Sequence, residues 1–271
     1  MNRVDLADGH LAYDDLGDTA GGQPVLLLHD GTLDRRVWGP QLTGLPGYRL
    51  LVLDARGHGD SATPTLPYQR ADDVIALLDH LDLPAAFLVG QSMGGTTALD
   101  TALDHPDRVT GLVASGCGTS QQYWRGAFLV DLLHRQFEAA MRRDTAEYVE
   151  LFLRMWVDGP ARRPDEVPGG VRDLCRTMAM STATRHARPD PVLPGRAADS
   201  WERLPGLTVP LLLLTGELDC PDVHEMADRI ATAVPHAESL RVLGAGHMLN
   251  LERPDVFTAA VLRFLDTVRV G

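Results

Sequence analysis

The chain has 271 residues, of which 44% are hydrophobic and 23% are charged, and its 37 acidic and 25 basic side chains give a net charge of -12. This composition excludes a disordered or collagen-like chain and is typical of one large globular α/β unit. The negative charge argues against nucleic acid and anionic membranes as partners, because both are polyanions.

Short apolar runs that are bounded by turn residues predict buried strands. These runs cover residues 24–28, 48–53, 85–89, 111–115, 209–214 and 240–243. Runs that are apolar at nearly every position are typical of strands covered by helices on both faces. Helical patterns at 74–81 and 96–103 supply the crossovers of a parallel sheet. The sequence therefore predicts an α/β fold with a mostly parallel central sheet flanked by helices.

The alternation of strands and helices is interrupted between residues 119 and 204. Apolar side chains recur there at helical spacing in three sets: Trp124, Phe128, Leu132 and Leu133; Tyr148, Leu151, Phe152, Met155 and Trp156; and Val171, Leu174, Cys175 and Met178. We therefore expect a helical cap at 119–204, inserted between two parts of the core, 1–118 and 205–271. We interpret these stripes as core packing. The alternative is that some of their side chains also line a substrate pocket beneath the cap.

The three cysteines, Cys117, Cys175 and Cys220, are odd in number and scattered, so they indicate neither a disulfide framework nor a zinc site. No apolar stretch approaches the roughly 18–20 residues that span a bilayer. The N-terminal residues lack the basic start and apolar run of a signal peptide. A cytoplasmic location is the default expectation.

Two partial motifs fail as metal or cofactor sites. His224 begins a pattern like that of a zinc helix, but Asp228 stands where the second histidine is needed. Gly116-Cys117-Gly118 begins like a dinucleotide loop, but Gln121 replaces the third glycine. We therefore expect no metal and no cofactor, with a small-molecule substrate as the partner.

The segment Gly90-Gln91-Ser92-Met93-Gly94 follows a predicted strand and opens a predicted helix. This is the context of the G-x-S-x-G turn, in which a serine sits on a strained connection between strand and helix. Its glycines remove Cβ atoms that would clash with neighbouring backbone. The sequence therefore predicts that Ser92 is a nucleophile, and a serine that merely caps the helix is the alternative.

A nucleophilic serine needs a base to take its proton, and the base needs a carboxylate to hold it. In this architecture the carboxylate and then the histidine follow the serine along the chain. Asp219 and His247 each lie in a loop after a predicted strand, at the edge where open α/β sheets build their sites. We predict Asp219 as the acid and His247 as the base, although Glu217 and Asp222 lie close enough in sequence to compete with Asp219.

The oxyanion that forms during acyl transfer needs two backbone N–H donors. The residue after the nucleophile, Met93, supplies one of them. The second comes from an early loop, His29-Asp30-Gly31-Thr32, which directly follows the first predicted strand. We predict Gly31 as the second donor.

Five motifs in this order resemble those of the α/β-hydrolase fold family, specifically its capped members. They are His29-Asp30-Gly31, Asp54-Ala55-Arg56-Gly57-His58-Gly59-Asp60-Ser61, Gly90-Gln91-Ser92-Met93-Gly94-Gly95, Gly216-Glu217-Leu218-Asp219 and Gly246-His247. The resemblance covers nearly the whole chain and implies Ser92 as nucleophile, Asp219 as triad acid and His247 as base.

Among capped hydrolases, the chain resembles small ester and lactone hydrolases of the 3-oxoadipate enol-lactonase type. The spacing from His29 to Trp38 and the Asp158-Gly159-Pro160 segment carry this resemblance. The family usually has His-Gly at the oxyanion loop, whereas this chain has Asp30 in the second position. A carboxylate that pointed into the hole would repel the oxyanion, so we expect Asp30 to point outward and brace the loop. Arg56 and His58 are expected to brace a neighbouring turn.

These features favour a cofactor-independent serine hydrolase that cleaves a carboxylic ester or a lactone. A hydrolase of carbon–carbon bonds or a perhydrolase with the same triad is the second hypothesis, because fold and triad do not separate these reactions. A ligand-binding receptor that retains the pocket is the third. Haloalkane and epoxide hydrolases resemble the chain but carry Asp where it has Ser92. The sequence leaves the substrate and the oligomeric state open.

Overall fold

The computed structural model describes residues 1–17, 21–188, 190–195 and 199–270. Within these residues one eight-stranded sheet has the order β1-β2-β4-β3-β5-β6-β7-β8. The strands are β1 Asn2–Leu6, β2 Gly9–Gly17, β3 Gln23–Leu28, β4 Tyr48–Leu53, β5 Ala86–Gln91, β6 Val109–Ser115, β7 Leu211–Gly216 and β8 Glu238–Val242. β2 pairs antiparallel with β1 and β4, and all the other pairs are parallel. The predicted mostly parallel sheet is confirmed.

The apolar runs of the sequence do not predict the hairpin that β1 and β2 form. Strand β2 is buried at Leu11, Ala12 and Tyr13 but continues into Asp14 and Asp15, so it never forms a continuous apolar run. Its turn contains Asp8-Gly9, a dipeptide common in tight hairpin turns, which is the signal that could have revealed it.

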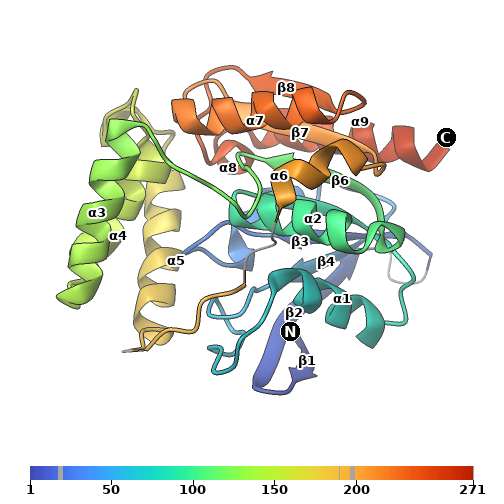
Figure 1. The fold of residues 1–271 in the computed structure, drawn as a ribbon, viewed down its shortest axis with the longest axis horizontal. Helices are drawn as coiled ribbons and strands as arrows, with labels where there is room; N and C mark the ends of the chain where they lie inside the picture. Colours follow the sequence, from blue (N-terminus) through green and yellow to red (C-terminus); the bar gives the residue numbers. More distant parts are fainter. Residues whose placement is uncertain (18–20, 189, 196–198, 271) are drawn as a thin grey trace.

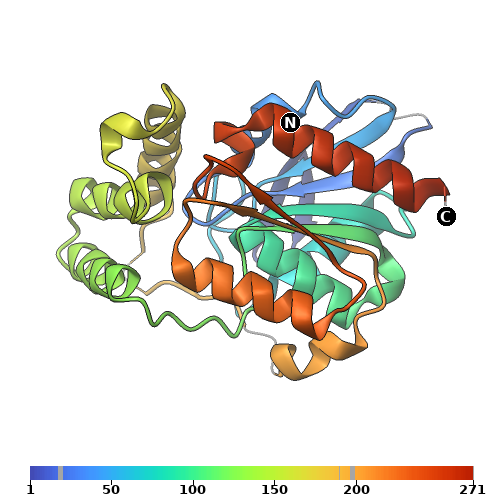
Figure 2. The same cartoon turned by 90° about the horizontal axis from the view of Figure 1, so that it is seen from above.

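Helices cover both faces of the sheet, as Figure 2 shows from above. One face is covered by α1 Arg70–His80, α2 Met93–Asp104 and α7 Pro221–Ala233, and the other by η1 Arg35–Gln41, α8 Leu249–Glu252 and α9 Pro254–Val270. Strand residues alternate between the two cores: Leu26 and Leu28 face α1 and α2, whereas Val25 and Leu27 face η1 and α9. This burial on both faces explains why the parallel strands read as uninterrupted apolar runs.

Four helical elements between β6 and β7 form a separate block at one side of the sheet in both Figure 1 and Figure 2. We call them the cap: α3 Ala127–Met141, α4 Thr145–Phe152, the π-helical η3 Leu153–Asp158 and α5 Val171–Arg185. Shorter helices complete the chain: η2 Pro106–Arg108, η4 Pro164–Glu166, α6 Ser200–Arg203 and η5 Leu204–Gly206. No helix in the described residues combines the length and apolar character that crossing a membrane requires.

Polar contacts join the cap to the sheet loops. The Arg162 guanidinium forms a buried ion pair with Glu252 at the end of α8. At the far end of α5, Arg185 lies 3.0 Å from the Asp60 carboxylate, and the His186 ring lies 2.7 Å from the Thr63 hydroxyl. These contacts hold the cap over the loops that follow the parallel strands.

Candidate active site

Ser92 lies on the turn between β5 and α2 in a strained conformation, with φ 52° and ψ -112°. Close backbone packing enforces this turn: a Cβ added at Gly94 would lie 2.0 Å from the Leu28 carbonyl oxygen, and one added at Gly90 would lie 2.2 Å from that of Gly94. The serine itself remains partly exposed. The predicted glycines therefore have the steric role that the motif requires.

Asp219 and His247 meet in the loops after β7 and β8. The His247 Nδ1 lies 2.8 Å from the Asp219 Oδ2, and both side chains are buried. The other carboxylate oxygen of Asp219 accepts a hydrogen bond from the Cys220 N–H at 2.7 Å. Glu217 and Asp222 bind elsewhere, to the Gly244 N–H and to the backbone at the start of the cap. Of the three carboxylates, Asp219 is the one that holds the imidazole.

The surroundings of His247 favour its protonated form. Burial alone would lower the pKa of the imidazole, but the charge of Asp219 and its hydrogen bond outweigh this effect and raise the pKa above its usual 6.5. The charges of Asp30 and Glu252 act in the same direction. A carboxylate that accepts from Nδ1–H leaves Nε2 unprotonated in the neutral ring, and an unprotonated Nε2 can take a proton.

Gln91 joins the serine turn to the histidine loop, a role that the sequence analysis missed. Its side-chain amide donates to the His247 carbonyl oxygen at 2.7 Å, and its amide oxygen accepts from the Ser115 hydroxyl at 2.6 Å. The Ser92 N–H donates to the Ser115 carbonyl oxygen at 2.7 Å. Gln91, Ser115 and His247 are all buried, so these hydrogen bonds fix the loop relative to the serine.

We expect Gln91→Leu to lower kcat by roughly 10–100-fold, since a misplaced base weakens proton transfer. The variant leaves the Ser115 hydroxyl and the His247 carbonyl without their partner, so it should also melt earlier. Ester turnover and a thermal melt are the measurements. Ser239→Ala, on the exposed surface of β8, is the matched control. Wild-type kcat in Gln91→Leu would mean that this network does not position His247.

Two neutral histidines orient the turn that carries Gly31. The His29 Nε2 lies 3.0 Å from the Ala55 N–H, which can only donate, so the His29 Nδ1 carries the proton and donates to the Asp30 carbonyl oxygen at 2.7 Å. That carbonyl belongs to the same planar peptide as the Gly31 N–H, so the N–H is fixed in the opposite direction. An added Cβ at Gly31 would lie 3.9 Å from the Cβ of Met93, so the two predicted donor residues lie next to each other.

The second histidine is His58. Its Nε2 accepts from the Thr32 N–H at 3.2 Å, and its Nδ1 donates to the Arg56 carbonyl oxygen at 2.9 Å. Burial and the neighbouring His29 lower the pKa of His58 to about 3, so the ring stays neutral at physiological pH. Thr32, a β-branched residue, is held at φ 66°, a conformation it rarely adopts. The prediction that Arg56 and His58 brace the structure agrees with these contacts and with the ion pairs of Arg56 to Asp8 and Asp73.

The expected bracing role of the Asp30 side chain is wrong. The side chain is 1% exposed, and neither carboxylate oxygen has a hydrogen-bond partner in the described residues. Burial raises the pKa of this carboxyl to about 7, against the opposing effect of His247. The prediction rested on the repulsion between an ionised carboxylate and the oxyanion, and a carboxyl group whose pKa is raised by burial is less subject to that repulsion.

The cap contributes an aromatic side chain to the site. The Trp156 ring in η3 lies 4.7 Å from the His247 ring, and Trp124 packs edge-on against Trp156 at 5.4 Å between centroids. Both tryptophans are partly exposed. Trp156 therefore lies beside the imidazole, whereas Met155 of the same predicted stripe is buried in the core. Leu151, with Phe128 and Leu132 of another stripe, lines a cavity within the cap.

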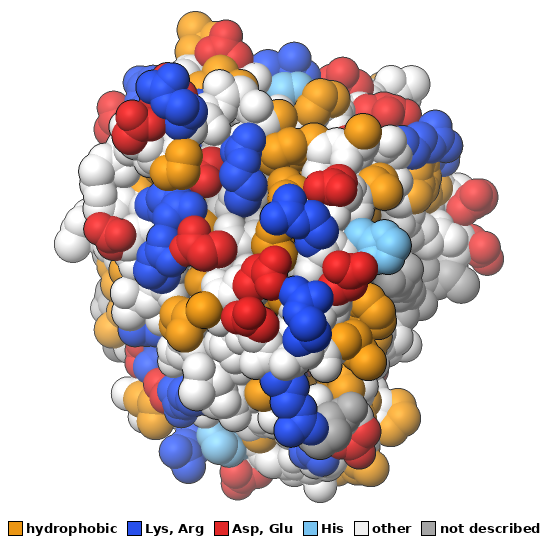
Figure 3. Space-filling model, turned by 90° about the vertical axis from the view of Figure 1, so that its left-hand side faces the viewer, with side chains coloured by type: hydrophobic (Ala, Val, Ile, Leu, Met, Phe, Trp, Pro, Cys, Tyr) orange, Lys and Arg blue, Asp and Glu red, His pale blue; other side chains and the backbone are white. Residues whose placement is uncertain are grey.

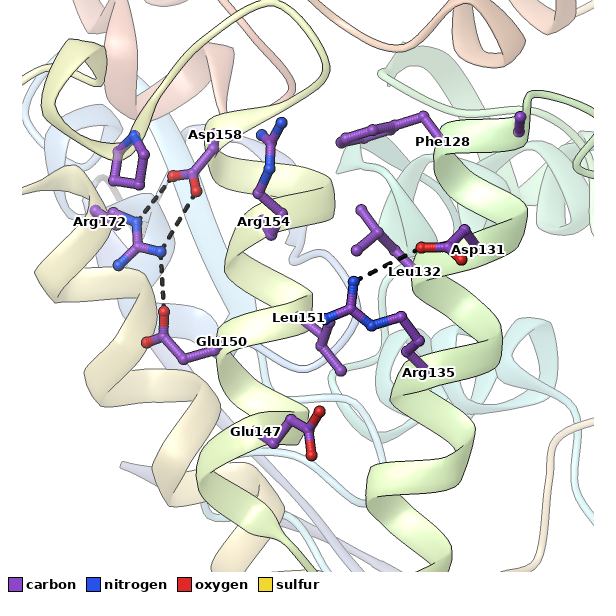
Figure 4. Close-up of a pocket in the computed structure, with 12 residues that line it drawn as sticks. Phe128, Asp131, Leu132, Arg135, Glu147, Glu150, Leu151, Arg154, Asp158 and Arg172 are labelled. Carbon is purple, nitrogen blue, oxygen red and sulfur yellow. Dashed lines mark hydrogen bonds and ion pairs between the residues drawn. The ribbon is translucent and has the colours of Figure 1, made fainter.

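A cavity of about 620 Å³ lies within the cap, between α3, α4 and α5, rather than at Ser92 (Figure 4). Its charged groups largely pair with one another: Arg172 binds Asp158 and Glu150, and Arg135 faces Asp131. Figure 3 shows the same interspersion of positive and negative side chains over this side of the molecule. We interpret these pairs as the interactions that hold the cap helices together.

Comparison with known proteins agrees with this fold and arrangement. A family model described as the alpha/beta hydrolase family matches residues 25–260. The chain therefore belongs to the alpha/beta hydrolase family, which confirms the predicted resemblance and the predicted fold class.

Curated relatives and solved structures are similar over most of the chain. It is 31% identical to a pimeloyl-[acyl-carrier protein] methyl ester esterase of Edwardsiella ictaluri, over 91% of this chain and 95% of that protein. It is also 31% identical to 3-oxoadipate enol-lactonase 2 of Acinetobacter baylyi, over 79% and 77% of the two chains. The structure of an enol-lactonase from Burkholderia xenovorans has a TM-score of 0.77 at 26% identity and covers 95% of this chain and 97% of its own. These named relatives agree with the prediction of a carboxylic ester hydrolase.

Proposed function

We propose that this protein hydrolyses a small carboxylic ester or lactone through Ser92, His247 and Asp219. The observation that carries the proposal is the buried hydrogen bond between His247 and Asp219, in a loop that Gln91 ties to the strained Ser92 turn. Similarity to a methyl ester esterase and to an enol-lactonase supports ester or lactone chemistry.

In this mechanism the Ser92 hydroxyl attacks the substrate carbonyl while His247 takes its proton. Asp219 keeps the imidazole in the required tautomer and stabilises the imidazolium that forms. The Met93 and Gly31 N–H groups hold the oxyanion. The His247 imidazolium then protonates the leaving alkoxide, and a water activated by His247 releases the acyl group from Ser92. Besides the substrate and the water, every group in these steps belongs to the chain itself.

The cap places Trp156 against the base, so it bounds the space available to the substrate. An apolar ring in this position favours an uncharged group of the substrate beside His247. The ester or lactone hydrolase and the alternative carbon–carbon hydrolase or perhydrolase would use the same triad. Only identifying the bond that the enzyme cleaves or forms can distinguish them.

A substrate panel tests the proposal. It contains a short-chain p-nitrophenyl ester, an aliphatic methyl ester, a five-membered lactone and a β-diketone, each given to wild type and to Ser92→Ala. Turnover of an ester or the lactone that Ser92→Ala loses supports the proposal. Cleavage of the diketone alone supports the carbon–carbon hydrolase. Binding of panel members without turnover favours a receptor and contradicts the proposal.

The pH profile of kcat/KM provides a further prediction. His247 must be neutral to accept the proton, so activity rises with pH as the imidazolium loses its proton. Because the pKa of His247 is raised, the midpoint of this acidic limb should lie above 6.5. Initial rates with an uncharged ester across pH 5–9 measure it. A rate that does not change between about pH 5 and 8 would exclude His247 as the base.

A further inference from the structure

Asp30 is a buried carboxyl group without a hydrogen-bond partner. Buried carboxyl groups are normally satisfied, because an unpaired buried polar group destabilises the fold. Other buried carboxylates of this chain follow that rule: Asp54 accepts from the Arg35 and Asp60 N–H groups, and Asp34 binds the Arg36 guanidinium. Asp30 is an exception to this rule, because neither of its carboxylate oxygens has a hydrogen-bond partner within the described residues.

This carboxyl lies beside the proposed oxyanion site. Asp30 immediately precedes Gly31, and its carbonyl is pinned by His29. The charged or titratable side chains that interact electrostatically with this carboxyl are Asp34 before η1, His247 after β8 and Cys175 on α5 of the cap. The side chain is therefore buried within electrostatic range of the base and of the cap, one residue before Gly31.

We propose that Asp30 is a catalytic residue whose neutral carboxyl group donates a hydrogen bond to the oxygen of the substrate's scissile carbonyl, beside the N–H groups of Gly31 and Met93. This inference rests on the proposed function. The proton is shared in a hydrogen bond and is not transferred, so the step leaves the bonds of the acyl transfer unchanged. The missing partner of the buried side chain is then the substrate itself.

Whether the Asp30 side chain assists or opposes formation of the oxyanion depends on its protonation state. An ionised Asp30 would repel the oxyanion. A neutral carboxyl group instead donates a hydrogen bond to the oxygen, and this hydrogen bond strengthens as negative charge develops there. Burial and the nearby Asp34 charge favour the neutral form and outweigh the opposing effects of His247 and of the Asp30 backbone N–H, so the pKa is raised to about 7. The active enzyme thus needs neutral Asp30 together with neutral His247, which gives a bell-shaped profile whose limbs belong to the coupled pair.

Two substitutions test this role. Asp30→Asn keeps a donor but cannot ionise, so we expect kcat within about threefold of wild type near neutral pH and loss of the alkaline limb. Asp30→Ala removes the donor, and we expect kcat to fall about 10–100-fold with KM nearly unchanged. Asp34→Asn is the matched control: it removes a neighbouring charge that raises the pKa of Asp30, so the alkaline limb should move to lower pH but persist.

Thermal stability separates this role from a structural one. Below about pH 4 both the folded and unfolded states hold the proton of Asp30, and between pH 4 and 7 only the folded state keeps it. Wild-type stability therefore falls as pH rises through this window. We expect the melting temperature of Asp30→Asn to exceed that of wild type by several degrees at about pH 8, and by less near pH 4.

Three results would overturn the inference. They are Asp30→Ala with wild-type kcat, Asp30→Ala or Asp30→Gly with kcat/KM raised more than about tenfold, and variants that melt earlier than wild type at pH 8. The second would mean that the carboxylate opposes the oxyanion, and the third that Asp30 braces the loop. Failure of the wild type itself to turn over any ester or lactone would instead contradict the proposed function.

Discussion

Ser92→Ala should lower kcat for the best ester of the panel by at least about 10⁴-fold. The substitution removes the atom that forms the acyl-enzyme and leaves the oxyanion donors and the cap in place. KM should change little, because the substrate is bound by groups other than the hydroxyl. Initial rates with purified variants, measured at the pH optimum, give both constants.

The matched control for this experiment is Ser239→Ala, which removes an exposed serine hydroxyl from β8. It should retain wild-type kcat and KM. Ser92→Ala should also unfold at the wild-type temperature or above it, because the turn conformation depends on Gly90 and Gly94 rather than on the hydroxyl. A Ser92→Ala enzyme with more than about a tenth of wild-type kcat would exclude Ser92 as the nucleophile.

Asp219→Asn should lower kcat by about 10³–10⁴-fold, the loss expected when a triad carboxylate becomes an amide. The structure gives the reason for the size of this effect. The Cys220 N–H donates to one oxygen of Asp219, so the amide oxygen of Asn takes that position and its NH₂ group faces His247. Nδ1 must then accept, and the proton moves to Nε2, where it prevents His247 from acting as a base.

Glu217→Gln is the control for Asp219→Asn, because Glu217 lies in the same loop and was a competing candidate from the sequence. Its carboxylate is exposed and accepts from the Gly244 N–H. We expect less than about a threefold change in kcat. Equal losses in the two variants would mean that the loop conformation, rather than the carboxylate on His247, sustains activity.

The fold and the three proposed catalytic side chains could be predicted because local rules specify them. Strands buried on both faces are apolar throughout, and the strained turn at Ser92 requires glycine at fixed positions. Asp219 and His247 follow from chain order in this architecture, although only the geometry shows that Glu217 and Asp222 bind elsewhere.

Features that depend on distant contacts could not be predicted. The π-helical turn at 153–158 departs from the α-helical spacing assumed for Trp156 and places this ring beside His247. The Gln91 side chain forms a hydrogen bond with a residue 156 positions away, and no local sequence pattern distinguishes Gln91 from an ordinary polar residue. At Asp30 the sequence shows an acidic residue in a loop, and only the three-dimensional structure shows that both carboxylate oxygens are buried without a hydrogen-bond partner in the described residues.

We propose that Ser92 is an activated nucleophile beside a formed oxyanion site. Intact-mass measurement after treatment with a fluorophosphonate tests it most directly, since the reagent reacts with activated serines without needing the natural substrate. We expect one stoichiometric adduct on wild type, none on Ser92→Ala, and slower labelling of Asp219→Asn. Folded wild type that remains unlabelled, or an adduct of equal yield on Ser92→Ala, would contradict the account.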